Sequence, residues 1–140
     1  MKQDVTPMRS VDVVGARSTR QKAAIRKAFD GANRPLSASE VLEISSSDVS
    51  GIGIATVYRN IKFMLEAGVL ATVELPGQAP RYERNGLQRH HYFHCTSCDK
   101  VYSVGLCEVS TKKVLPRGFK LAGHTTILYG TCSACGNGSR

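Results

Sequence analysis

Four of the chain's five cysteines form two C-x-x-C pairs, and this feature restricts most strongly how the chain can fold. Cys95 and Cys98 make up one pair, and Cys132 and Cys135 make up the other. Each pair presents two thiolates from a tight turn, so two pairs supply the four corners of a tetrahedral zinc ion. We therefore predict a structural zinc that clips the start of the chain's second half to its end. Reduced core cysteines and a redox dithiol are the alternatives.

The length and composition are those of a globular chain. Its 140 residues, 41% of them apolar, suit one ordinary domain or two small ones. No apolar run is long enough to cross a membrane, and the N-terminus carries charges where a signal peptide needs an apolar stretch. We expect a soluble, cytoplasmic protein without a membrane partner. In that reducing compartment, paired cysteines favour metal binding over disulfides.

A formal net charge of +8 favours an anionic partner, although excess charge alone more often serves solubility than binding. The placement of the charge is therefore more informative than its amount. The segment 17–27 contains no acid and five basic residues, which are Arg17, Arg20, Lys22, Arg26 and Lys27. Positive charge is thus concentrated near the start of the predicted fold.

The first half of the chain is typical of three consecutive helices, over residues 18–32, 37–45 and 54–68. The terminal signals are Ser18 or Thr19 and Gly31 for the first helix, a capping box of Ser37 and Glu40 for the second, and Gly68 for the third. The apolar residues at helical spacing are Ala24, Ile25, Ala28 and Phe29, then Ala38, Val41 and Leu42, then Ile54, Val57, Ile61, Met64 and Leu65.

After the third helix, the pattern changes to one that favours strands. The segments 69–75 and 80–84, joined by "PGQA", predict a two-stranded hairpin. Three helices followed by a hairpin suggest a winged helix-turn-helix, whose last helix enters the DNA major groove while the hairpin rests on phosphate. The polar segment 85–89 fits a linker. Further strands are expected at 91–95, 101–104, 119–124 and 126–130, with a short helix near 108–115, which makes the fold α+β.

On the third predicted helix, several polar side chains lie away from the apolar stripe, and Tyr58 lies at its edge. Tyr58 can contact a thymine methyl group, and Arg59 can bind a phosphate or a guanine edge. The alternative is that Tyr58 packs in the core and Arg59 is a solvated charge. The polar residues concerned are Thr56, Arg59, Asn60 and Lys62.

Cys107 is the one unpaired cysteine. It opens a different class of function, a zinc-stabilised thiol redox sensor or redox enzyme with Cys107 as its reactive centre. A metal ligand and a small buried apolar residue are the other interpretations of this cysteine. The sequence contains no Gly-rich phosphate loop and no paired catalytic carboxylates, so we do not expect an enzyme.

The segment "HHYFHC" contains three of the chain's four histidines. Alternate side chains of a strand share a face, so this one predicted strand can supply ligands to two sites, one on each face. Positions i and i+4 lie about 13 Å apart, too far to bind one ion without a bend. His90 and His94 are therefore poor partners for one metal. The two faces are His90, Tyr92 and His94 on one side, and His91, Phe93 and Cys95 on the other.

From about residue 15 to 136, the chain resembles the ferric uptake regulator family of metal-dependent repressors. The resemblance is carried, in order, by "GARSTRQK", "SASEVL", "GIGIATVYRNIKFMLEAGVL", "RYER", "HHYFHCTSCDKVYSV" and "HTTILYGTCSAC". It implies a winged-helix DNA-binding domain over residues 1–84, a linker over 85–89 and an α/β dimerisation domain over 90–140. It also implies a homodimer on a palindromic operator in double-stranded DNA. Relatives sense iron, manganese, zinc, nickel or peroxide.

The resemblance also assigns individual residues. Arg17 matches a basic residue that enters the minor groove, although a plain surface charge is the alternative. In the inter-domain sensing site, Glu83 and His90 match ligands of the family. Three further ligand positions hold Pro35, Tyr92 and Ser103 instead. We therefore expect that site to bind metal weakly or to be vacant.

A second regulatory site is implied on the opposite face of the same strand. His91 and His124 match ligand positions of the family's second site, and Glu108 lies near its acidic position. We expect a second divalent ion, Fe²⁺, Mn²⁺ or Zn²⁺, to bind there rather than beside Glu83 and His90. The alternative is that His91, His94 and His124 are ordinary polar or core histidines.

Overall fold

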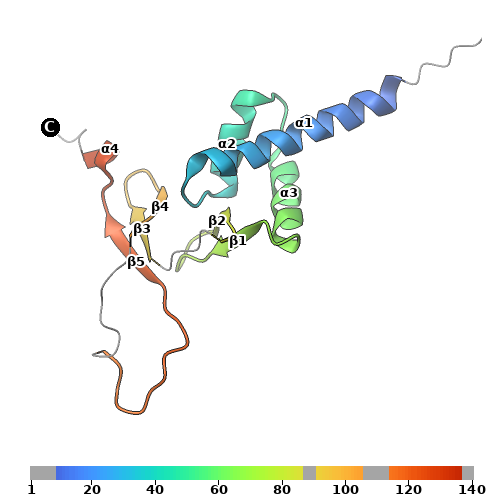
Figure 1. Ribbon diagram of the computed structural model, residues 1–140. Coiled ribbons are helices and arrows are strands. Elements are labelled where there is room, and N and C mark those ends of the chain that lie inside the picture. The colour runs from blue at the N-terminus through green and yellow to red at the C-terminus, as the bar shows by residue number, and fades with distance from the viewer. Residues whose placement is uncertain (1–8, 87–90, 106–113, 137–140) are drawn as a thin grey trace, which may run out of the picture.

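A computed structural model describes residues 9–86, 91–105 and 114–136 of the chain. Its helical first half is followed by a hairpin and then by a small separate sheet (Figure 1). The elements are α1 (Arg9–Ala32), α2 (Ala38–Asp48), α3 (Ile54–Glu66), β1 (Leu70–Val73), β2 (Arg81–Arg84), β3 (His91–Cys95), β4 (Val101–Ser103), β5 (Thr126–Gly130) and α4 (Ser133–Gly136). This α+β order agrees with the expected fold class.

The first helix is longer than predicted. The expectation of an N-cap at Ser18 or Thr19 is wrong, because α1 already begins at Arg9. The Thr19 hydroxyl donates to the carbonyl of Gly15, 2.9 Å away, so it bonds inside the helix rather than capping it. The predicted apolar face is confirmed, since Ala24, Ile25, Ala28 and Phe29 are all buried.

The second helix begins with the predicted capping box. The Glu40 amide donates to the Ser37 hydroxyl at 3.2 Å, and the Ser37 amide donates to the Glu40 carboxylate at 2.9 Å. The other carboxylate oxygen of Glu40 accepts from Arg34 at 2.7 Å. Two amides that α2 leaves without a helical partner are thereby satisfied, which locks the start of the helix.

The third helix ends just before Gly68, the glycine that the sequence predicted as its terminal signal. Gly68 has φ +75°, its amide donates to the carbonyl of Leu65, and the Val69 amide donates to the carbonyl of Met64. These two bonds form a Schellman motif, which requires a left-handed residue at that position. Along α3, the burial of Val57, Ile61 and Met64 is confirmed. Ile54, the first residue of α3, departs from the prediction and is 41% exposed.

The core of the first half lies between the three helices and the hairpin. Leu36 and Tyr82 join the two through a pair of backbone hydrogen bonds of 2.8 Å. β1 and β2 pair antiparallel, with Val73 opposite Arg81 and Ala71 opposite Glu83. Tyr82 packs into the core between the helices, so its neighbours in β2 face the other way. The first half is therefore a winged helix-turn-helix, as predicted.

The second half is a three-stranded sheet in the order β4-β3-β5. The central strand β3 pairs antiparallel with β4 and parallel with β5. The strands expected at 91–95, 101–104 and 126–130 are confirmed. The strand expected at 119–124 is wrong, because that segment is irregular and pairs with no strand of the described sheet. The helix expected near 108–115 lies mostly outside the described residues.

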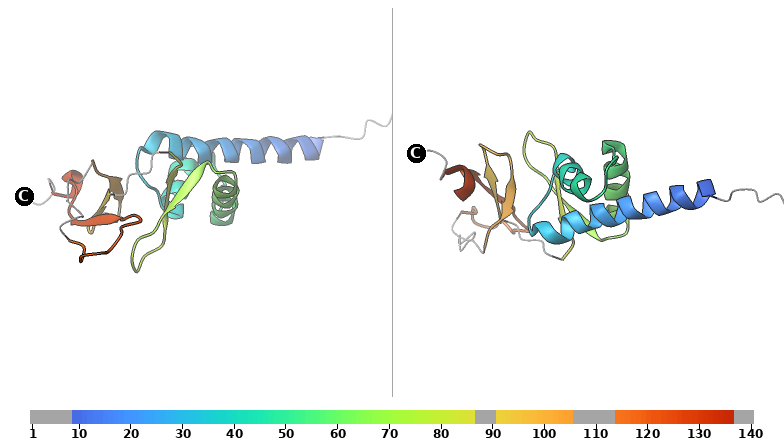
Figure 2. Two further views of the ribbon diagram at one scale, coloured as in Figure 1. Left: turned by 60° about the horizontal axis from the view of Figure 1, so that its bottom comes forward. Right: turned by 90° about the horizontal axis from the view of Figure 1, so that it is seen from above.

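The sheet lies beside the hairpin end of the helical half and far from the start of α1 (Figures 1 and 2). A small apolar cluster joins the two halves, with Val73 and Leu75 from the hairpin segment and Tyr92 and Val101 from the sheet. Since half of this cluster belongs to the hairpin, the two halves share a core. Within the described chain, no helix is long and apolar enough to cross a membrane.

We expect Ser37→Ala to lower the free energy of unfolding by about 1 kcal/mol, because the Glu40 amide loses its capping acceptor. Urea denaturation followed by circular dichroism measures this difference. Ser46→Ala is the matched control, because Ser46 is an exposed serine of the same helix. Equal stabilities of the two variants would show that the capping box contributes nothing.

Candidate metal centre and nucleic-acid interface

The four paired cysteines meet at the end of the three-stranded sheet. All four sulfur atoms lie within 4.8 Å of one another, and the sulfurs of Cys98 and Cys132 are 3.8 Å apart. A tetrahedron with zinc–sulfur bonds of about 2.3 Å has edges of about 3.8 Å. The residues present thus fit the ion. In the described part of the chain, no other group of three or more His, Cys, Asp or Glu side chains could hold a metal.

Strand pairing explains why the two cysteine pairs meet. Cys95 ends β3 and lies opposite Gly130, the last residue of the parallel strand β5. Parallel strands end at the same edge of a sheet, so Cys132 follows directly onto the turn that holds Cys95. The Cys132 amide donates to the Cys95 sulfur at 3.3 Å, and the Thr96 amide donates to the carbonyl of Gly130 at 2.8 Å.

Backbone amides prepare two of the thiols for metal binding. Hydrogen bonds from the amides of Cys98 and then Cys132 lower the pKa of Cys95 to about 6. The Cys135 amide lowers the pKa of Cys132. Cys135 has its pKa raised to about 12, chiefly because its thiol donates to the Cys132 sulfur. These backbone hydrogen bonds favour the thiolate forms of Cys95 and Cys132, and zinc binding would displace the protons that remain on the cluster.

The exposed face of α3 carries the polar residues that the sequence singled out. Tyr58 is 51% exposed, so the alternative in which it packs in the core is wrong. Arg59 is exposed and donates to the hydroxyl of Thr56 at 3.2 Å, while the side-chain Nδ2 of Asn60 donates to the backbone carbonyl of Thr56 at 2.8 Å. These bonds hold three neighbouring polar side chains in a fixed arrangement on one face.

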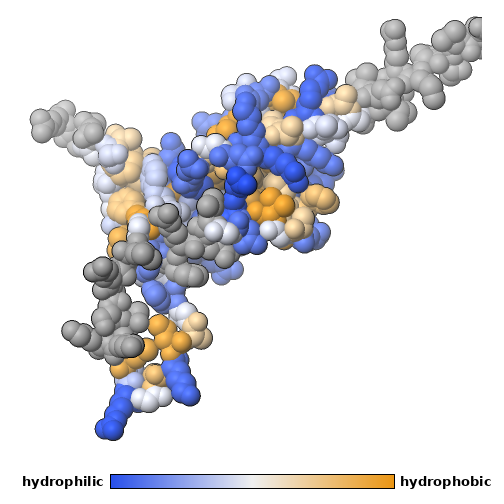
Figure 3. All heavy atoms as spheres, viewed as in Figure 1, coloured by the Kyte–Doolittle hydropathy of each residue, from blue (hydrophilic) through white to orange (hydrophobic). Residues whose placement is uncertain are grey.

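The basic residues of α1 extend this polar surface. Arg17 is exposed, and its guanidinium lies against Gly51 in the turn before α3, where a Cβ atom would come within 2.7 Å of it. A groove between α1 and α3 is lined by Ser18, Gln21, Lys22, Thr56, Arg59, Asn60 and Phe63. Hydrophilic side chains predominate on the visible face of the helical half (Figure 3). Such a basic, polar surface suits a polyanion such as DNA.

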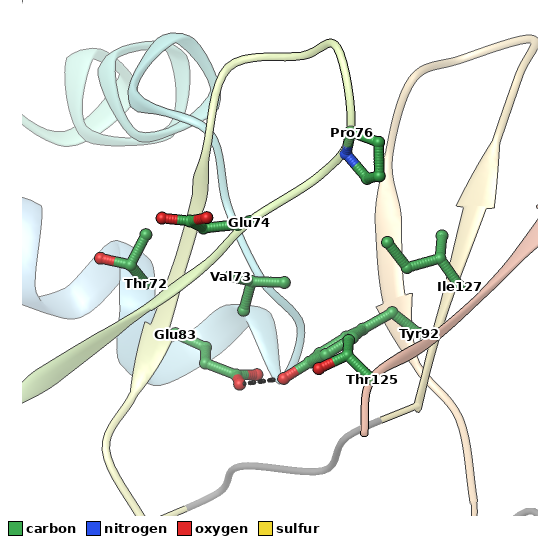
Figure 4. A pocket seen from close by; sticks show the side chains of 8 residues that line it. All are labelled: Thr72, Val73, Glu74, Pro76, Glu83, Tyr92, Thr125 and Ile127. Atoms are coloured by element: carbon green, nitrogen blue, oxygen red, sulfur yellow. Dashed lines mark hydrogen bonds between the residues drawn. The ribbon is translucent and has the colours of Figure 1, made fainter. Parts of the chain in front are cut away.

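Beneath the hairpin, Tyr92 reaches Glu83 across the boundary between the two halves. The Tyr92 hydroxyl donates to Glu83 Oε1 at 2.6 Å, and both residues are buried (Figure 4). The pKa of Tyr92 is strongly raised, first by burial and then by the hydrogen bond to Glu83. The phenol therefore stays protonated and acts as a donor. This pair lines a cavity of about 540 Å³, together with Thr72, Val73, Glu74, Pro76, Thr125 and Ile127.

His91 and His124 lie together at the other side of the sheet. Their ring centroids are 5.1 Å apart, although the two residues are 33 positions apart in the sequence. Within the described residues, the buried Nδ1 of His91 has no hydrogen-bond partner, which leaves its lone pair or proton available. Glu108, Cys107 and His90 lie outside the described residues.

The model of the family described as "Ferric uptake regulator family" matches residues 13–129. The chain belongs to this family. Its members are metal-responsive transcriptional repressors. The chain is accordingly a DNA-binding transcriptional regulator and not an enzyme, and nothing supports the redox enzyme proposed for Cys107.

Individual relatives agree with this membership. The zinc uptake regulation protein of Mycobacterium tuberculosis is 33% identical over 132 residues, which cover 89% of this chain and 98% of that protein. The crystal structure of FurB from M. tuberculosis, a zinc uptake regulator, has the same identity and coverage and a TM-score of 0.50. Fur of Helicobacter pylori is 18% identical, with a TM-score of 0.63 over 97% of each chain, and supports the fold alone.

The three departures from the ferric uptake regulator pattern have structural consequences. Pro35 is fully buried and offers no donor atom on its side chain. Tyr92 holds the Glu83 carboxylate by a direct hydrogen bond. Ser103 lies opposite Tyr92 in the β3–β4 ladder, so it belongs to the same region. A protein hydrogen bond therefore occupies an oxygen that the resemblance assigns to a metal.

The sequence did not single out Asp99 and Arg81, which contact each other beside the turn that carries Cys95 and Cys98. Asp99 Oδ1 lies 2.6 Å from His94 Nε2, and Asp99 Oδ2 lies 3.1 Å from the guanidinium of Arg81. His94 is thus an ordinary buried polar histidine in the described structure, as the alternative stated. The acid directly after Cys98 was the available signal for Asp99. Arg81 carried no signal, since its partner lies in the other half of the fold.

We expect chelation to remove one zinc per chain and to unfold the second half, because ligand binding there is folding free energy. The near-ultraviolet tyrosine signal and the oligomeric mass should fall, while the far-ultraviolet helical signal persists. Circular dichroism and light scattering measure these quantities. Cys98→Ser should reproduce the loss, whereas Cys107→Ser, the matched control, should keep its zinc. A chelated protein with unchanged tyrosine signal and mass would contradict this expectation.

Proposed function

We propose that this regulator binds a palindromic operator in double-stranded DNA as a homodimer and acts in the cytoplasm. Residues 1–84 form the DNA-binding domain, 85–89 the linker and 90–140 the dimerisation domain. The observation that carries the proposal is the exposed polar face of α3 beside the basic surface of α1. A winged helix presents this helix to the major groove.

In the proposed complex, Tyr58 reads base edges and Arg59 binds a phosphate or a guanine. Exposure of both side chains supports these roles. Thr56 and Asn60 support Arg59 and the helix surface through the hydrogen bonds described above. Arg17, beside the turn that precedes α3, approaches the minor groove or its flanking phosphates.

The proposed dimer is supported by apolar side chains that the second half exposes. Leu128 and Tyr129 lie in β5, which is an edge strand of its sheet. Val114, Phe119 and Leu121 lie in the segment before β5, which projects from the sheet (Figure 1). Apolar atoms also gather on that projecting segment (Figure 3). An exposed edge strand and an apolar surface both favour pairing with a second chain.

For regulation, we propose that the metal response does not depend on Glu83 and His90. Glu83 already accepts a hydrogen bond from Tyr92, so an ion there would have to compete with it. The second divalent ion, Fe²⁺, Mn²⁺ or Zn²⁺, is bound by His91, His124 and Glu108 instead. The proximity of the two imidazole rings supports this choice. The name of the M. tuberculosis relative makes zinc the first ion to titrate.

Substitution of Arg17 and Tyr58 should separate general from specific DNA binding. We expect Arg17→Ala to weaken binding to all DNA and to flatten the slope of log K against log salt by about one unit. Tyr58→Ala should weaken operator binding more than binding to random DNA. Fluorescence anisotropy on both duplexes across a salt series tests this. Equal losses for Tyr58→Ala on the two duplexes would exclude base reading by this residue.

A metal titration distinguishes the two faces of β3. Operator binding by the wild type should respond weakly to micromolar iron or manganese, because coupling requires differential binding of the ion to two states. Whatever response exists should be lost in His91→Ala and kept in His90→Ala. A strong response that His90→Ala abolishes and His91→Ala leaves intact would assign the working site to the Glu83 face.

A further inference from the structure

Arg81 is a basic residue of the wing that is turned away from solvent. Its side chain is 3% exposed, whereas Arg84 of the same strand is 53% exposed. A buried guanidinium needs acceptors and a counter charge, because both its donors and its charge are costly to remove from water. Arg81 cannot reach a DNA phosphate from this position. Its partners inside the protein must therefore define its role.

These partners connect the wing to the metal centre. One terminal nitrogen of Arg81 donates to the carbonyl of Ala79 in the hairpin loop at 2.8 Å. The other donates to both the carbonyl and the carboxylate of Asp99, each at 3.1 Å. Asp99 follows Cys98 directly in the sequence. The guanidinium thus bridges the wing and the turn that carries two of the zinc ligands.

Asp99 is itself held firmly in that turn. Its amide donates to the Cys95 carbonyl at 2.9 Å, and its backbone is left-handed with φ +64°, a conformation that Asp and Asn tolerate. Its second carboxylate oxygen lies 2.6 Å from His94 Nε2. An ionised carboxylate only accepts, so His94 donates. One oxygen of Asp99 therefore binds the wing, and the other binds β3.

A second contact joins the same two halves. Arg34, between α1 and α2, places its guanidinium 5.7 Å from the ring centroid of Tyr102 in β4, the strand that follows the cysteine turn. The same guanidinium binds Glu40, which closes the capping box of α2. The region of the zinc ligands thus holds the winged helix at two separate points, the wing and the start of α2.

We propose that Arg81 is a positioning residue for DNA recognition, which acts through Asp99 to fix the orientation of the winged helix on the zinc-binding turn. This inference rests on the proposed function, a homodimer on a palindromic operator. In such a dimer, the separation of the two α3 helices depends on how each winged helix sits on its dimerisation domain. Arg81 and Asp99 consequently determine which spacing of operator half-sites the dimer accepts.

The test measures half-site spacing with the full-length, zinc-loaded protein. A duplex selected by the wild type from a randomised pool is the probe, and versions with one base pair added or removed between the half-sites are compared with it. One base pair shifts a half-site by about 3.4 Å and rotates it by about 35°. We expect this change to cost the wild type about tenfold in affinity, as a mismatched base pair does.

We define the spacing ratio as the affinity for the selected duplex divided by the affinity for a duplex with one base pair added or removed. Arg81→Met and Asp99→Asn should each reduce this ratio to within about threefold. The double variant should reduce it little further, because both substitutions remove the same interaction. Arg81→Lys keeps the charge and should restore part of the ratio. Arg84→Met is the matched control. It removes an exposed arginine of the same strand, which is ion-paired at 3.3 Å with Asp30 inside the winged helix rather than with the second half, and it should leave the dependence on spacing unchanged. Zinc content and dimer mass should match the wild type in every variant.

Unchanged spacing ratios in Arg81→Met and Asp99→Asn, with zinc and dimer intact, would overturn the inference. A wild type that enriches no sequence from the pool would instead contradict the proposed function. Hydrogen exchange of the DNA-free dimer then tests the Arg81–Asp99 contact without DNA. The amides of β2 should exchange faster in Arg81→Met and Asp99→Asn but not in Arg84→Met. Equal exchange rates of the β2 amides in all three variants would exclude a role of the Arg81–Asp99 contact in holding the wing.

Discussion

The parallel pairing of β3 with β5, closed at its end by four cysteines, is the constraint on which the second half depends. The described residues of that half bury few apolar side chains of their own, chiefly Tyr92, Cys95 and Val101. A core of this size cannot offset the conformational entropy of ordering the chain. A structural zinc, whose binding energy is folding energy, supplies what the core lacks. The hairpin supplies the rest, since Val73 and Leu75 complete the apolar cluster.

The shared core has a consequence for regulation. Because β2 has a period of two, Tyr82 packs among the helices while Arg81 and Glu83 face the second half. Each of these two polar residues is buried and has a partner across the boundary, Asp99 for one and Tyr92 for the other. The contact between the two halves therefore combines these hydrogen bonds with the apolar cluster of Val73, Leu75, Tyr92 and Val101.

This arrangement changes how a metal can act. In a regulator whose domains meet only through an ion, the ion has a large differential affinity for the closed state. Where Tyr92 and Arg81 hold the closed state, as we propose for this protein, less free energy remains for an ion to supply. His91, whose ring packs on His124, precedes Tyr92 in β3, so its side chain lies on the opposite face of the strand from Tyr92. An ion bound there would act on the sheet and the dimer rather than on the wing directly.

Local sequence signals predicted the elements whose physics is local. The capping box of Ser37 and the glycine stop at Gly68 depend on hydrogen bonds within a few residues, so both could be derived without a fold. The predicted start of α1 was wrong because the Thr19 hydroxyl can either cap a helix or bond to a carbonyl within one, and here it does the second. The segment 119–124 has strand-like residues but pairs with no strand of the described sheet, so its composition alone did not decide its structure.

By itself, the sequence determined the four-cysteine cluster, the winged helix and the polar exposed face of α3, because spacing and periodicity encode them directly. Only the tertiary structure decided what Tyr92 and Arg81 do. Tyr92 could be recognised as a missing ligand, but its bond to Glu83 required β2 and β3 to be placed side by side. Arg81 looked like one more basic residue of a wing. Its burial against Asp99, 18 positions away, follows from long-range packing that no local pattern reports.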